Sequence, residues 1–348
     1  MKKFNTVSKF LFAVLFIFLF SICSFAVDYK YNTEKIEEKD LNEIELYPGG
    51  MPFGIKMTFK GLSIVKFASE SSPAYRAGMK VGDIIIKVND EDVDSIEEFT
   101  RLINKSGNST VDITIIRNDK EYTFKVKPEL CRDDGLYKTG VWVKDSASGI
   151  GTVTFINPEN NAFGGLGHGI CESSNGKVIP LSRGTIMDVS INGVIKGRCG
   201  AAGELKGAFS TKKLGALTKN SNQGVFGVLS SSCLEAPEGK MKICPKEEVK
   251  EGEAYIWCTL GDEKPQKYSV YLSSIDTTNT GVKNFRVKIT DKRLLERSGG
   301  IVQGMSGSPI IQNGRIVGAV THVLINDPTS GYGIFIENML NAMPEILK

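Results

Sequence analysis

The stretch Gly304-Met305-Ser306-Gly307-Ser308-Pro309 is a glycine-rich turn between two apolar runs, residues 300–302 before it and residues 310–311 after it. Glycine adopts backbone angles that other residues resist, and it lets another backbone approach closely. A turn of this kind can direct the N–H groups of Gly304 and Ser306 at one point, as an oxyanion hole requires. Ser306 is therefore a candidate nucleophile. The alternative is a glycine-rich hairpin with a solvent serine, and the rest of the chain has to decide between the two.

The region around this turn, from residue 141 to the end, consists of short apolar segments separated by glycine-containing turns. Many short strands with turn signals are typical of an all-β barrel or sandwich. A terminal helix is expected over residues 337–347. The expected strands are residues 149–156, 160–164, 178–181, 189–191, 224–229, 254–259, 267–275, 284–289, 310–311, 316–323 and 333–336.

Histidine is the usual general base for a serine nucleophile, and this chain contains only two. His168 lies among four glycines in residues 163–170, a setting that suits an open site better than core packing. His322 lies on the strand expected after the nucleophile turn, where a packed or partly exposed strand histidine is the simpler interpretation. We therefore predict His168 as the base and keep His322 as the reserve candidate, for the base or for a residue of the substrate pocket.

An acidic residue that orients the base is harder to assign. Asp291 lies fifteen residues before Ser306, and Asp145, Asp188 and Asp327 are other acids in this region. An acidic residue in the first turn of a short helix is also stabilised by the helix dipole. The residues alone leave open whether Asp291 orients His168 or caps a helix.

Residues 48–129 have a different pattern, with strands expected at 55–59 and 62–67, a short helix ended by a glycine, and a hairpin over 111–126. Ser95 is placed to cap a helix over residues 96–105, with Glu98 completing a capping box. The motifs Ser72-Pro73-Ala74, Ala77-Gly78, Val81-Gly82-Asp83-Ile84-Ile85 and Val88-Asn89 resemble a PDZ domain of the bacterial protease type. PDZ domains hold an extended peptide on a strand edge, often with its C-terminal carboxylate in a loop of backbone N–H groups. By position, that peptide-binding loop would be Phe53-Gly54-Ile55.

The first 27 residues read as a targeting segment. Lysines precede an unbroken apolar run over residues 10–20, and Ser24-Phe25-Ala26 is a plausible cleavage site. With the following residues the run is about as long as a short membrane span, so an uncleaved anchor is the alternative.

The 348-residue chain has a net charge of +3, which falls to zero without the three lysines of this segment, so nothing indicates a nucleic-acid partner. Six cysteines beyond it permit disulfides in an exported protein, but cysteines so scattered can equally be buried thiols.

Residues 300–314 look like the serine segment of the stage IV sporulation protein B peptidases of spore-forming bacteria. Residues 319–323 and 326–333 match the segments that follow it, and residues 149–155 with Leu166-Gly167-His168 resemble the histidine segment. Leader, PDZ domain and peptidase domain occur in that family's order, so the resemblance covers essentially the whole chain.

The resemblance implies a serine endopeptidase with a chymotrypsin-like double β-barrel, in which Ser306 is the nucleophile, His168 the base and Asp291 the acidic member. It implies no metal or organic cofactor. It also implies export to the space between the two forespore membranes, cleavage of the protein's own N-terminal region, and cleavage of a membrane-bound regulator that releases activation of a late sporulation sigma factor. Ser308 stands where glycine is usual and is a rival nucleophile, but the amides of Gly304 and Ser306 favour Ser306.

We therefore predict a signal peptide or membrane anchor (1–27), a linker accessible to proteolysis (28–47), a PDZ domain (48–129) and a serine peptidase domain (130–348). The PDZ domain would bind a protein partner or this chain's own N-terminal segment. The main alternative is a non-catalytic scaffold in which a degenerate protease domain only docks. A hydrolase of non-peptide esters is the weaker alternative.

Overall fold

The computed structural model describes residues 41–172, 176–230, 239–261 and 264–348. The expected leader and residues 28–40 of the expected linker lie outside the described residues. Within the described part, no helix is long and apolar enough to cross a membrane.

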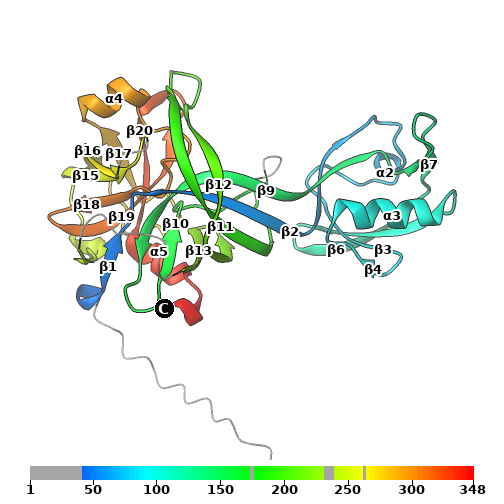
Figure 1. Cartoon of the computed structure of the whole chain (residues 1–348), viewed down its shortest axis with the longest axis horizontal. Helices are drawn as coiled ribbons and strands as arrows, with labels where there is room; N and C mark the ends of the chain where they lie inside the picture. The colour runs from blue at the N-terminus through cyan, green and yellow to red at the C-terminus, as the bar shows by residue number, and fades with distance from the viewer. Residues whose placement is uncertain (1–40, 173–175, 231–238, 262–263) are drawn as a thin grey trace, which may run out of the picture. The chain divides into compact units, whose positions relative to one another are not determined.

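Six strands close into a first barrel (Figure 1). The pairing of β9 with β2 closes the ring, and the core inside it includes Phe53, Met57, Phe163 and Leu217. Around the ring the strands are β2 (Pro52–Phe67), β9 (Val141–Ile156), β10 (Ala162–Gly165), β13 (Gly224–Leu229), β12 (Glu204–Ser221) and β11 (Leu181–Ile195). Two short strands, β1 (Glu45–Pro48) and β14 (Met241–Lys242), extend the sheet from β9.

A second closed barrel follows in the chain and carries the nucleophile turn. Its core contains Ile256, Val270, Phe285 and Val287. Its strands, in order around the barrel, are β15 (Gly252–Cys258), β16 (Gln266–Ser273), β17 (Phe285–Ile289), β20 (Asp327–Phe335), β19 (Arg315–Leu324) and β18 (Pro309–Gln312). The expected chymotrypsin-like double β-barrel is therefore confirmed.

The PDZ domain lies between β2 and β9 in the chain and has its own core, which includes Ile64, Ile85, Phe99 and Ile113. Ser95 caps its main helix as predicted, because its hydroxyl accepts a hydrogen bond of 3.2 Å from the N–H of Glu98. The elements are α2 (Pro73–Arg76), β3 (Ile84–Val88), β4 (Glu91–Asp92), α3 (Ile96–Ser106), β5 (Val111–Arg117), β6 (Lys120–Val126), β7 (Glu129–Leu130) and β8 (Tyr137–Lys138).

Two long strands, β2 and β9, are shared between the barrel and the PDZ domain. The sequence predicted separate strands at 55–59 and 62–67, but these are one strand. Gly61 has φ +84 and the register with β9 shifts between Thr58 and Ser63, so the pairing is interrupted while the strand continues. The first half of β2 pairs with β11 and its second half with β3. The expected PDZ boundary at residue 48 is therefore wrong, because residues 52–59 are barrel strand and the PDZ domain is an insertion.

The C-terminal segment is shorter in helix than expected. Helix α5 covers Ile336–Ala342, and a 3₁₀ turn covers Glu345–Leu347. Pro344 separates the two, since proline cannot donate the hydrogen bond that would continue the helix. The remaining elements are helix α4 (Lys292–Ser298) and short 3₁₀ turns at Leu41–Glu43 and Lys246–Glu248.

Candidate active site

The nucleophile turn is held in a backbone conformation that requires glycine on both sides of Ser306. Gly304 and Gly307 have φ +96 and +95. A Cβ on Gly307 would lie 2.1 Å from the carbonyl oxygen of Thr152, so no other residue fits there. Ser308 is fully buried, and its hydroxyl donates a hydrogen bond of 2.6 Å to the Met305 carbonyl. Ser306, and not Ser308, faces the open side of the turn.

A cavity of about 450 Å³ brings Ser306 together with both histidines. His168 and His322 line its wall, with their ring centroids 5.0 Å apart and the rings tilted by 41°. The Ser306 hydroxyl donates a hydrogen bond of 2.9 Å to the carbonyl of Thr321, the residue before His322. A rotation of Ser306 about its Cα–Cβ bond would release this hydroxyl toward the cavity. In the described arrangement the hydroxyl is bonded to the Thr321 carbonyl and not to either histidine.

His168 has the tautomer that a general base needs. Its Nδ1 lies 2.9 Å from the carbonyl oxygen of Gly169, and since a carbonyl can only accept, Nδ1 carries the proton. The lone pair of Nε2 is then available to take a proton from Ser306. Burial lowers the pKa of His168, and the hydrogen bond with Gly169 opposes this only in part. The imidazole is therefore neutral at neutral pH, as a base must be.

His322 occupies the cavity wall, which is the role that the sequence held in reserve. Burial, with the neighbouring His168 and Lys283, lowers its pKa to about 4. Its Nδ1 is buried and has no hydrogen-bond partner among the residues that the structure describes. His322 is therefore neutral at neutral pH and lines the cavity beside His168.

The free energy of unfolding is expected to fall as the pH is lowered from 6.5 to 4. In this window the unfolded chain protonates His322, whose ordinary pKa is 6.5, while the folded chain does not. Stability is thus fully present above pH 6.5 and declines as the pH falls, by roughly 1–2 kcal/mol from this residue at pH 4, since solvent screens the partly exposed ring. Denaturant titration of the wild type and of His322→Asn across this range measures it. Equal losses in the two proteins would contradict the assignment.

Two N–H groups of the turn are without an acceptor among the described residues, which an oxyanion hole requires. The N–H of Met305 donates to Val302 and the N–H of Gly307 donates to Val320, at 3.1 and 2.8 Å. The N–H groups of Gly304 and Ser306 have no acceptor among the described residues. Every second N–H group of the turn is thus bonded, and the two that are left are the ones predicted from the sequence. The oxyanion hole stays a hypothesis, and the two unbonded N–H groups support it.

Asp291 is a helix cap. Its carboxylate accepts a hydrogen bond of 2.9 Å from the N–H of Arg293 at the start of α4, and it pairs with the Arg293 guanidinium at 2.8 Å. These interactions hold the pKa of Asp291 below its usual range, with the Arg293 side chain as the main cause. Asp291 does not line the cavity that holds His168. The structure therefore does not bring the predicted acid to the base.

Asp291→Asn separates the two roles, because asparagine caps a helix about as well as aspartate but carries no charge. If Asp291→Asn hydrolyses peptides at the wild-type rate and is as stable as the wild type, Asp291 acts only as a helix cap. A loss of about 10⁴ in kcat assigns orientation of His168.

Thr152 is a site residue that sequence reasoning missed. Its hydroxyl donates to the carbonyl of Gly304 at 2.8 Å and its N–H donates to the carbonyl of Ser306 at 3.0 Å. Its own carbonyl accepts from Leu166, two residues before His168. One strand residue of the first barrel thus joins the nucleophile turn to the histidine segment. A signal was present, since Thr152 and Thr154 are the polar residues in the otherwise apolar stretch 149–156.

Thr152→Val is expected to lower kcat/KM by about tenfold and stability by about 1–2 kcal/mol, because the buried Gly304 carbonyl loses its donor. Thr259→Val is the matched control, since its buried hydroxyl makes the same kind of bond to the Gly50 carbonyl at 3.0 Å, outside the cavity lining. Hydrolysis assays and denaturant titration of both variants test this. If Thr152→Val loses no more activity than Thr259→Val for the same loss of stability, Thr152 does not position the nucleophile turn.

The predicted peptide-binding loop Phe53-Gly54-Ile55 is not a PDZ loop. All three residues are buried in β2, with both strand edges paired, to β9 on one side and β11 on the other. A strand with two paired edges cannot accept an added peptide strand. This prediction was wrong because the first half of β2 belongs to the barrel, where Ile55 lines the catalytic cavity.

The groove of the PDZ domain lies between α3 and the start of β9, where there is a cavity of about 580 Å³. Phe99 and Ile103 of α3 line one side, and Val141 and Val143 of β9 line the other. Gly140 precedes the strand with φ +77, and its N–H has no acceptor among the described residues. This loop has the free N–H and the adjoining apolar groove that capture of a C-terminal carboxylate requires.

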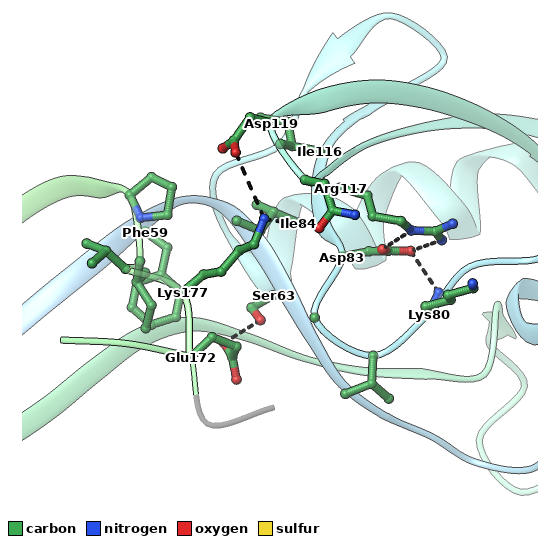
Figure 2. Close-up of a pocket in the computed structure, with 16 residues that line it drawn as sticks. Phe59, Ser63, Lys80, Asp83, Ile84, Ile116, Arg117, Asp119, Glu172 and Lys177 are labelled. Carbon is green, nitrogen blue, oxygen red and sulfur yellow. Dashed lines mark hydrogen bonds and ion pairs between the residues drawn. The ribbon is translucent and has the colours of Figure 1, made fainter. Parts of the chain in front are cut away.

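Figure 2 shows a second cavity, of about 310 Å³, where the histidine segment of the peptidase meets the PDZ domain. Glu172, four residues after His168, accepts a hydrogen bond of 2.6 Å from Ser63 of the PDZ part of β2. Lys177 donates to Asn118 at 3.0 Å and lies 3.9 Å from the Asp119 carboxylate. The PDZ domain therefore contacts the segment that follows His168, the predicted base.

The fold is a double β-barrel with an inserted PDZ domain, and one cavity holds a serine and two histidines. The family model described as SpoIVB peptidase S55 matches residues 135–340, and a PDZ domain model matches residues 64–117. The chain belongs to the SpoIVB peptidase family.

Among curated proteins, the chain is similar to the serine protease Do-like HtrA of Bacillus subtilis, 39% identical over 77 residues that cover 22% of this chain and 17% of that protein. It is also similar to a probable periplasmic serine endoprotease DegP-like of Bartonella henselae, 31% identical over 110 residues that cover 26% of this chain and 22% of that protein. The chain thus spans about a fifth of the length of these relatives.

Among solved structures, the Rv3671c protease of M. tuberculosis in its active form is 13% identical, with a TM-score of 0.33, and the match covers 56% of this chain and 72% of that one. Among the cysteines that the structure describes, Cys131, Cys171, Cys199 and Cys244 are free thiols.

Proposed function

We propose that this chain is an endopeptidase that cleaves its own N-terminal region and a membrane-associated regulatory protein in the space between the forespore membranes, and so triggers activation of a late sporulation sigma factor. The observation that carries the catalytic part is the single cavity that holds Ser306, His168 and the turn with two unengaged N–H groups. Membership of the SpoIVB peptidase family supports the sporulation part. Export, by a leader that is cleaved or kept as an anchor, is part of the same proposal.

The chemistry follows from the groups in the cavity. Ser306 Oγ attacks the scissile carbonyl while Nε2 of His168 takes the hydroxyl proton. The N–H groups of Gly304 and Ser306 stabilise the oxyanion, an effect worth roughly 3–4 kcal/mol per donor in comparable sites. His168 returns the proton to the leaving amine as the C–N bond breaks. Water, deprotonated by His168, then hydrolyses the acyl-serine ester and frees Ser306.

One observation favours the scaffold alternative, in which the protease domain only docks. The Ser306 hydroxyl is bonded to the Thr321 carbonyl and not to His168. Catalytic hydrogen bonds are often long or absent before substrate binds, so this geometry is equally compatible with a resting enzyme. Activity has to separate the two.

The test is trimming of the full-length chain in a purified system, followed by mass spectrometry of the N-terminus. The wild type is expected to lose its N-terminus by cleavage within residues 28–44, before strand β1, and Ser306→Ala is expected to stay intact. Wild type added to Ser306→Ala then reports cleavage between molecules. Identical trimming of both proteins, each purified alone, would leave the peptidase proposal without support.

A further inference from the structure

Strand β9 joins the PDZ groove to the catalytic cavity. One edge of β9 pairs with β2 from Val141 to Thr152. On the opposite edge, pairing with β10 begins only at Val153, and among the described residues no strand pairs with β9 on that edge before it. Figure 1 shows β9 running beside β2 over this length. The first half of β9 therefore offers an unpaired edge to which an extended chain can add.

The two ends of this edge are the two sites described above. At its start, Val141 and Val143 line the PDZ groove, directly after Gly140. At its end, Gly149 and Ile150 line the catalytic cavity. The next residue but one, Thr152, donates its N–H to the Ser306 carbonyl at 3.0 Å. The nucleophile turn therefore lies against β9 directly beyond the open stretch.

We propose that a protein substrate other than this chain's own N-terminal region lies antiparallel along this edge, with its C-terminal carboxylate at Gly140 and its scissile bond at Ser306, so that cleavage occurs at a set distance from the C-terminus. The direction follows from the groove. A carboxylate held before the first residue of a strand places the rest of the peptide alongside that strand in the opposite sense. Antiparallel strands pair one residue with one.

The distance follows from the register. Ile150 lies nine positions after Val141. At about 3.4 Å per residue this is about 30 Å of extended chain. The bond cleaved is therefore about nine to eleven residues before the C-terminus of the substrate. The short fragment along β9 is the amine leaving group, and the longer N-terminal part remains as the acyl-enzyme.

Two features keep this spacing constant. Strands β2 and β9 run without a break through both domains. The contacts of Glu172 with Ser63 and of Lys177 with Asn118 add a second connection between the two domains (Figure 2). A rigid connection is what turns two separate sites into a length requirement.

The inference rests on the proposed peptidase function, and peptides of graded length test it with the full chain. A constant cleavable segment, matching the site mapped in the trimming assay, is followed by flexible spacers of about 4, 7, 10, 13 and 16 residues and an apolar C-terminal residue. We expect kcat/KM to be highest near 10 and at least tenfold lower at 4 and at 16. Replacement of the terminal carboxylate by an amide is expected to remove the maximum.

Thr100→Trp is the matching variant, because Thr100 is an exposed residue of α3 that lines the groove, so that a large side chain there blocks it with little risk to folding. It should flatten the length dependence and leave hydrolysis of a small ester substrate unchanged. Hydrolysis that depends on neither length nor carboxylate overturns the inference while the peptidase function stands. An absence of hydrolysis with every peptide and with the ester overturns both.

Discussion

Ser306→Ala is expected to lower kcat/KM for peptide hydrolysis by about a millionfold, to the level that binding and the oxyanion donors alone provide. The physical reason is that the oxygen nucleophile is gone while the turn is unchanged. The measurement is hydrolysis of a fluorogenic peptide by purified protein, with stability checked in parallel.

Ser308→Ala is the control for this first prediction, since both serines stand in the same turn. The Ser308 hydroxyl is buried and bonded to the Met305 carbonyl. Its removal should cost about 1 kcal/mol of stability and leave hydrolysis within about tenfold of the wild type. The reverse pattern, with Ser308→Ala inactive and Ser306→Ala active, would assign the nucleophile to Ser308.

His168→Ala is expected to cost as much activity as Ser306→Ala, and the double variant is expected to be no worse than either single one. Nucleophile and base act as one unit, so their losses do not add. His322→Ala is the matched comparison, because the two rings share the cavity. It should reduce hydrolysis far less, by roughly tenfold to a hundredfold, since the neutral tautomer of His168 is fixed by Gly169 and not by His322.

Single-turnover kinetics on the three variants measure this prediction without interference from product release. The acid limb of the wild-type profile should lie below the ordinary histidine pKa, because burial lowers the pKa of His168. Activity retained in His168→Ala and lost in His322→Ala would make His322 the base.

The sequence identified Ser306 and His168 correctly as members of one cavity because their signals are local. Both stand in glycine-rich segments, and a chain with two histidines leaves few alternatives. The helix cap at Ser95 was predictable for the same reason, since capping needs only residues three positions apart.

What failed depended on long-range pairing. The segment 52–59 reads as a strand in the sequence, but nothing local says that its partners are β9 and β11 of the barrel, at least 88 residues away in the chain. The PDZ loop was therefore assigned to Phe53-Gly54-Ile55 when the groove forms beside Gly140. Asp291 shows the complementary problem, since cap and catalytic acid have the same local pattern.

The central claim is that Ser306 is a nucleophile activated by His168, and covalent labelling with a fluorophosphonate tests it most directly. Peptide mass spectrometry of the full-length wild type is expected to show a single adduct, on Ser306. The adduct should be absent in Ser306→Ala and formed far more slowly in His168→Ala. An adduct on Ser308, or labelling of Ser306 at the same rate with and without His168, would contradict the account.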